Sequence, residues 1–188
     1  MSGLIQIVRR GEYYRVCKPD WVDCGDTTFS KANGGRWNPA TEFGALYLNA
    51  TVRVAAAQAR HQHAGRAIAL FDLRPERRPI LATFDITEIR VVDVVSAEAT
   101  RALRLPRAYP VGVDWEPCQR IARRAYREGI AGVVARSAAE ARVDEVVGEE
   151  LAYFDSQPAL SARDRKAFAD WYPDPYPTKG SRRRTGGS

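Results

Sequence analysis

The sequence is poor in the residues that hold metal ions or disulfide frameworks. It contains three cysteines and two histidines in 188 residues. Cys17, Cys24 and Cys118 follow no metal-ligand spacing. His61 and His63 alone are too few for a zinc site. The odd cysteine count leaves a Cys17–Cys24 disulfide open, although free thiols are what a reducing compartment favours. We therefore predict free thiols and no metal.

Long apolar runs are also absent. No stretch approaches the roughly 18–20 apolar residues that a membrane-spanning helix requires. The N-terminus lacks the order of a secretion signal, because its basic pair follows the short apolar run and no small-residue cleavage site comes after it. With 45% hydrophobic and 28% charged residues, the chain has the composition of a globular protein. We expect one cytoplasmic domain that has no membrane contact.

Positive charge is moderate and concentrated near the C-terminus. The formal net charge is +6, and residues 179–188 carry four basic and no acidic side chains. Without that stretch the excess is +2. A nucleic-acid-binding fold would spread its basic residues over a folded face. The charge distribution therefore argues against a nucleic-acid platform.

Strands and helices occur in blocks, which favours an α+β fold over a doubly wound sheet. Helices are predicted at 51–64 with Thr51 as N-cap, at 115–128 with Asp114 as N-cap, and at 161–169. Strands are predicted at 13–17, 45–48, 67–73, 80–86, 89–95, 132–135 and 151–154. Turn-forming residues separate the three consecutive strands from 67 to 95, which predicts an antiparallel meander.

The C-terminal composition changes at Trp171. Pro173, Pro175 and Pro177 follow at every second position, so no helix can continue through this segment. From about Trp171 onward we expect an extended aromatic and proline-rich arm, followed by a disordered basic tail.

The most unusual local stretch is Asn33-Gly-Gly-Arg-Trp-Asn-Pro39. Its double glycine lets the backbone pass close to a ligand or adopt a positive φ. The arginine that follows can present a fork to phosphate or ribose oxygens, and the tryptophan ring can stack. A little later, Tyr47 places a hydroxyl in a short buried strand. A glycine-rich hairpin whose aromatic residues fill the core is the competing interpretation.

This order of residues resembles the RES family, which is named for Arg, Glu and Ser. The segment GGRWNP, followed by ALYL and a helix, is its most specific part. Weaker matches follow in family order: Tyr14-Arg15, Asp114-Trp115 before a helix, Gly129-Ile130, Ser137 after a strand, and Glu150–Asp155. The resemblance implies a RES domain at 1–157 with a fold like that of ADP-ribosyltransferases. The remainder, 158–188, would hold the C-terminal helix, the arm and the tail.

The family resemblance also implies a site for NAD as substrate, with no separate cofactor. The implied NAD-binding residues are Arg15, Gly35, Arg36, Trp37, Asn38 and Tyr47. The residues implied for catalysis are Arg36, Tyr47, Gln58 and Ser137. Breaking the bond between nicotinamide and ribose develops positive charge on the sugar, so such a site must fix the ribose and stabilise an oxocarbenium-like state.

One position departs from the family pattern. The family glutamate falls eleven residues after the tyrosine, where this sequence has Gln58. An amide can bind a ribose hydroxyl but carries no negative charge. If the glutamate supplies about 3–4 kcal/mol, its loss slows the reaction by two to three powers of ten. Three explanations stay open: glutamine suffices, another acid substitutes, or the chain is attenuated. The candidate acids are Asp114, Glu149 and Glu150, and His61 could take part in proton transfer.

The function that the resemblance implies is that of a toxin in a type II toxin–antitoxin pair, which cleaves the nicotinamide–ribose bond of NAD by hydrolysis or phosphorolysis. Transfer of ADP-ribose to a protein is one alternative. A catalytically attenuated module that uses the same cleft for binding is another. The implied partners are an Xre-like antitoxin and NAD, and any contact with nucleic acid would be indirect, through the antitoxin.

Overall fold

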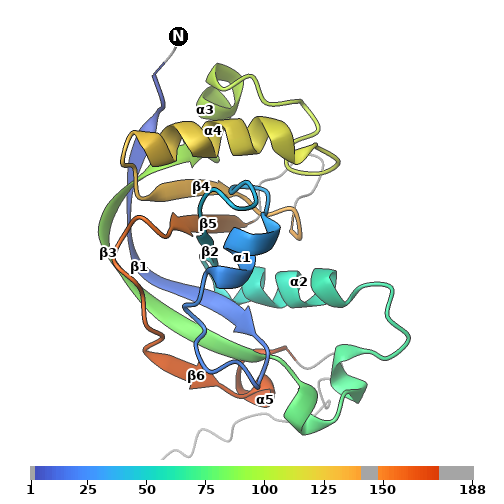
Figure 1. Ribbon diagram of the computed structural model, residues 1–188. Coiled ribbons are helices and arrows are strands. Elements are labelled where there is room, and N and C mark those ends of the chain that lie inside the picture. Colours follow the sequence, from blue (N-terminus) through green and yellow to red (C-terminus); the bar gives the residue numbers. More distant parts are fainter. Residues whose placement is uncertain (1–2, 141–147, 174–188) are drawn as a thin grey trace, which may run out of the picture.

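The computed structural model describes residues 3–140 and 148–173. Six strands form one mixed sheet in the order β1-β2-β5-β4-β3-β6, and β1 also pairs with β3. The first five strands of that order therefore close into a small barrel, and β6 extends from the edge of β3. Figure 1 shows β1 and β3 as a long curved pair along one side. The strand bounds are β1 Gln6–Cys17, β2 Ala45–Asn49, β3 Ile80–Val94, β4 Gly132–Arg136, β5 Glu149–Phe154 and β6 Asp164–Lys166.

The barrel interior is filled by alternate residues of its strands. Side chains on one face of a strand are two positions apart, so each strand can contribute every second residue to the same cluster. All five barrel strands do so, and their buried residues form one apolar cluster. Its largest members include Tyr13, Leu46, Phe84, Leu151 and Tyr153.

Helices cover the outer face of the barrel. Helix α4 (Trp115–Arg127) lies alongside β4, as Figure 1 shows, and its apolar stripe of Cys118, Ile121, Ala122 and Ala125 is buried. Helix α2 (Val52–His63) packs beside β1 together with α5 (Phe168–Trp171). The remaining helices are α1 Thr28–Asn33, α3 Ala97–Ala102 and the 3₁₀ turns η1 Leu70–Asp72 and η2 Pro75–Arg77.

Several sequence predictions are confirmed. The fold is mixed α+β, and α2 and α4 begin and end within one residue of the predicted bounds. The Thr51 hydroxyl accepts a hydrogen bond from the Val54 amide, as expected of an N-cap. Strands β2, β4 and β5 lie at the predicted places. All three cysteines are free thiols.

Three local predictions are wrong. Residues 67–73 form no strand; they make a loop and η1, because Leu70 turns into the cluster beside α2. Residues 80–86 and 89–95 are one strand, β3, which crosses the expected turn because β1 pairs with it along nearly its whole length. A meander is therefore absent. The predicted helix at 161–169 is strand β6 followed by α5. In addition, the Asp114 side chain makes no capping hydrogen bond.

The segment after residue 157 packs against the barrel. Strand β6 pairs with β3, and Phe168, Trp171 and Tyr172 join the cluster of α2. The proposed boundary at 157 thus separates 1–157 from a segment that shares its core. The expected arm beyond Pro173 and the basic tail lie outside the described residues. Within the described ranges, no helix is long and apolar enough to cross a membrane.

Candidate functional site

The glycine-rich segment forms a tight turn in which each glycine has a separate reason. Gly35 and Asn38 pair across the turn, and the Gly35 amide donates to the Asn38 carbonyl at 2.8 Å. Gly34 has a φ of +73°, a region that residues with a Cβ rarely adopt. A Cβ on Gly35 would lie 2.4 Å from the Tyr47 hydroxyl oxygen. The close backbone approach expected from the sequence is therefore an approach to Tyr47.

Tyr47 connects this turn to the sheet. Its hydroxyl accepts a hydrogen bond from the Trp37 amide at 2.9 Å and donates to Asn38 Oδ1 at 2.8 Å. Burial raises the pKa of this phenol well above its usual value. Because both hydrogen bonds are made within the protein, the hydroxyl holds Tyr47 in a fixed position in the wall of the neighbouring cavity.

Trp37 and Asn38 are buried beneath that turn. Asn38 is 0% exposed, and its amide nitrogen donates to the backbone carbonyls of Ser30 and Phe43. The Trp37 ring packs in the core with Tyr109. Neither residue lines the cavity described below, so the structure separates them from the other predicted site residues and makes them supports of Tyr47.

A cavity of about 360 Å³ opens beside Tyr47, between β1, β2, β5 and α2. Such a volume is in the usual range of small-molecule sites. It brings together Arg15, Tyr47 and Gln58 from the sequence prediction. Further polar residues of its wall are Lys18, Ser30, Asn49, Gln62, Arg77 and Glu150.

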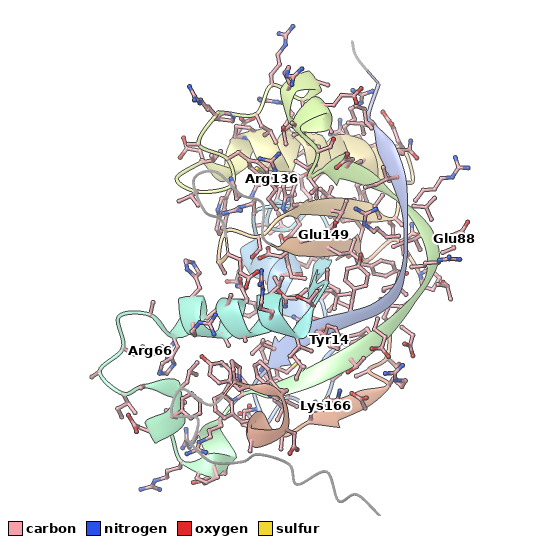
Figure 2. The ribbon with its side chains drawn as sticks, turned by 180° about the vertical axis from the view of Figure 1, so that it is seen from behind. Tyr14, Arg66, Glu88, Arg136, Glu149 and Lys166 are labelled. Atoms are coloured by element: carbon pink, nitrogen blue, oxygen red, sulfur yellow. The ribbon has the colours of Figure 1, made fainter. Side chains whose placement is uncertain are left out.

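A second chamber of about 590 Å³ adjoins the first. The two chambers share wall residues that include Lys18, Gln62 and Arg77, so they adjoin one another at these side chains. The second chamber extends past the end of α2 toward Arg66. Figure 2 shows Arg66 on the opposite side of the molecule from Glu88, which lies at the bend of β3.

Basic side chains gather along the β1 side of the first chamber. Arg15 Nη1 donates to the backbone carbonyls of Cys24 at 2.5 Å and Asp26 at 3.1 Å, and its guanidinium lies over the Trp21 ring. Burial lowers the pKa of Arg15. Lys18 follows β1, and Arg77 comes from η2. Because Lys18 and Arg77 lie in loop and turn segments, no periodic pattern in the sequence could associate them with Arg15.

Among the residues that the structure describes, one carboxylate lines the first chamber, on the β5 side. Glu150 pairs with Asn49 across β2 and β5, and its Oε1 accepts a hydrogen bond of 2.5 Å from the Ser137 hydroxyl. Burial raises the pKa of Glu150, while Ser137, Arg36 and His61 oppose that rise. Ser137 itself is only 1% exposed and does not line the chamber. The predicted site serine therefore holds Glu150.

Gln58 reaches the same wall from α2. Val54, Gln58 and His61 lie at positions i, i+4 and i+7, so they share one face of the helix. Val54 packs so closely on Gly148 that a Cβ there would lie 2.7 Å from the valine Cγ2. Because Gly148 stands just before β5, this helix face is directed at the start of the strand that carries Glu150.

The other predicted residues lie farther from the chamber. Arg36, at the tip of the glycine turn, does not line it, but its charge acts on both Tyr47 and Glu150. Asp114 precedes α4 and is absent from the wall. Glu149, labelled in Figure 2, is bound through both carboxylate oxygens by Arg9, each at 2.8 Å. Of the three candidate acids, only Glu150 lines the chamber.

These features define a class: a small α+β barrel protein with two adjoining cavities, the first of which has cations on one wall and a carboxylate on another. A family model described as "RES domain" matches residues 12–175, and the chain belongs to this family. The resemblance inferred from GGRWNP is thereby confirmed.

Two relatives named for their activity match part of the chain. The NAD(+) phosphorylase MbcT of Mycobacterium tuberculosis, and that of Mycobacterium bovis, is 30% identical over 105 residues. The match spans 56% of this chain and 56% of each relative. A crystal structure of the M. tuberculosis MbcT–MbcA toxin–antitoxin complex aligns with a TM-score of 0.68 at 22% identity, over 85% of both chains. That likeness shows the fold.

Proposed function

We propose that this protein binds NAD in the two-chamber cavity and cleaves the bond between nicotinamide and ribose. The observation that carries the proposal is the separation of charge within the first chamber, where Lys18 and Arg77 line the side shared with the second chamber and Glu150 lines the wall on β5. The second chamber adds Arg66 and the carboxylates of Asp20 and Glu76. NAD has the matching distribution, with an anionic pyrophosphate between two nucleosides and a cationic nicotinamide at one end. Opposite charges placed at matching positions orient a ligand as well as attract it.

The order of the strands supports this orientation. Strands β1 and β5 are separated by β2, so they lie about 10 Å apart along the sheet. With the pyrophosphate near Lys18 and Arg77, the nicotinamide riboside half enters the first chamber toward Tyr47 and Gln58. The adenosine half then occupies the second chamber, toward Arg66. Arg15 and Arg36 add positive charge on the approach to the ribose.

Inorganic phosphate is the acceptor that we favour, because the relatives named above are NAD(+) phosphorylases. We further propose that the protein acts in the cytoplasm as the toxin of a type II toxin–antitoxin pair, with an Xre-like antitoxin as partner, and that its barrel is related to that of ADP-ribosyltransferases. The solved complex of the similar fold, which joins a toxin to an antitoxin, supports the pairing.

Product analysis tests the proposal. Purified protein is incubated with NAD in phosphate buffer and in phosphate-free buffer, and nicotinamide and the ADP-ribose products are identified by mass. We expect nicotinamide together with phosphorylated ADP-ribose, and slower release of nicotinamide without phosphate. Free ADP-ribose in both buffers would indicate hydrolysis, and ADP-ribose attached to a protein would indicate transfer. NAD that stays intact at equimolar protein would overturn the proposal.

A further inference from the structure

We propose that Glu150 supplies the negative charge that the reacting ribose requires, at the place where Gln58 cannot. The inference rests on the proposed function and names the catalytic carboxylate of that same site. Gln58 has the position of the family glutamate on α2 but carries an amide. The structure places a carboxylate on the facing strand, in the wall of the same chamber.

The position of Glu150 suits this role for a geometrical reason. The side chains of Tyr47 and Glu150 lie on the outer face of the barrel, because Tyr47 pairs with Ala152 and Glu150 stands two residues before Ala152 on β5. Helix α2 then closes over this face, with Val54 against Gly148. Glu150 thus shares the wall of one chamber with Tyr47 and Gln58.

The carboxylate of Glu150 is also fixed in position through one of its two oxygens. Ser137 donates to one oxygen, Oε1, and no other hydrogen bond to Glu150 is formed within the described residues. The Ser137 amide in turn donates to the Gly148 carbonyl at 2.9 Å, which fixes the serine relative to β5. The second oxygen of Glu150 therefore remains for a ligand. The neighbouring Glu149 differs, because Arg9 engages both of its oxygens.

The chemistry needs a stationary negative charge. When the bond between the nicotinamide nitrogen and C1′ of the ribose breaks, its electron pair leaves with the nitrogen, and nicotinamide becomes neutral. Positive charge moves to C1′ and the ring oxygen. A phosphate oxygen then forms the new bond to C1′, and hydrogen phosphate keeps its own proton. Glu150 stabilises the transient cation without giving or taking a proton.

Electrostatics within the fold agree with a functional carboxylate. Burial raises the pKa of Glu150, so the folded protein disfavours the charged form when the site is empty. Arg36 and His61 favour the charged form from the glycine turn and from α2. At neutral pH the unfolded chain is ionised at this residue, and folding must therefore overcome the desolvation of the charge. A cationic ligand beside Glu150 would offset this cost of burying the charged carboxylate.

Steady-state nicotinamide release from NAD tests the assignment, with four proteins compared. They are the wild type, Glu150→Gln, the matched control Glu149→Gln on the same strand, and the double variant Gln58→Glu/Glu150→Gln. We expect Glu150→Gln to lower kcat by roughly 100- to 1,000-fold with a much smaller change in KM, because the lost interaction belongs to the transition state. The control should stay within about twofold of the wild type. The double variant should regain at least about tenfold over Glu150→Gln.

Thermal unfolding distinguishes a catalytic role from a structural one. The midpoint of Glu150→Gln should equal or exceed that of the wild type at pH 7, because the amide accepts from Ser137 without a buried charge. A Glu150→Gln protein that is less stable, or as active as the wild type, overturns this inference and leaves the proposed function standing. A wild type that releases no nicotinamide overturns both.

Discussion

Replacing Asn38 by alanine should destabilise the fold much more than it weakens NAD binding. The buried amide makes three hydrogen bonds: to the carbonyl of Ser30 at 2.7 Å, to that of Phe43 at 3.1 Å, and from the Tyr47 hydroxyl at 2.8 Å. Alanine removes all three and leaves their partners unsatisfied. At about 1 kcal/mol each, the free energy of unfolding falls by about 3 kcal/mol. For a chain of this length, Tm then falls by roughly 6–12 °C.

Thermal unfolding followed by circular dichroism measures the loss of stability. Titration calorimetry, at a temperature where the variant is still folded, measures NAD binding. Asn33→Ala is the matched control, because Asn33 ends α1 directly before the same turn but is exposed, and its amide donates to the Phe29 carbonyl within the helix. The control should change the unfolding free energy by less than about 0.5 kcal/mol. An Asn38→Ala protein with an unchanged Tm and no NAD binding would show that Asn38 contacts the ligand, contrary to the geometry.

Three further predictions follow from the site and the core. Gly35→Ala should lower both Tm and the rate of NAD cleavage, because its Cβ would displace the Tyr47 hydroxyl. In the control Gly65→Ala the new Cβ meets no neighbouring atom, so any loss of stability comes only from the positive φ of +76°. Unfolding scans and nicotinamide release are measured for both variants. Arg77→Ala should raise the Kd for NAD about 5- to 30-fold and weaken the salt dependence of binding. Arg74→Ala, three residues earlier, should do neither. NAD titrations at two salt concentrations in which both variants behaved alike would contradict this prediction. Cys118 should resist iodoacetamide at pH 8 in the folded protein, because burial raises its thiol pKa to about 11; rapid labelling detected by mass would refute that burial.

Local signals predicted the elements whose stability is set locally. Helix α2 begins at Thr51 because a hydroxyl N-cap and an apolar face suffice to define it. Helix α4 followed from its stripe of buried residues. The turn predicted near Glu88 is absent because a distant partner decides the structure there. Strand β3 continues through this position because β1, which is distant in the sequence, pairs with it across a bulge between Arg9 and Gly11.

The site was predictable to a similar extent. GGRWNP identified the family and the turn around Tyr47, but a motif cannot tell which of its residues support the fold and which face a ligand. The burial of Trp37 and Asn38 became evident only with the core in place. Lys18 and Arg77 belong to connections that only the closed barrel brings together. Glu150 was one of three candidate acids, and strand register, which places its side chain beside Tyr47, separates it from Glu149.

A structure of the Glu150→Gln protein with NAD bound tests the central claim most directly, since the slow variant should retain its substrate. We predict the pyrophosphate between Lys18 and Arg77, and the nicotinamide riboside half in the first chamber, with C1′ of the ribose beside residue 150 and Gln58. Phosphates bound away from Lys18 and Arg77, or a nicotinamide ribose directed into the second chamber, would contradict the proposed site.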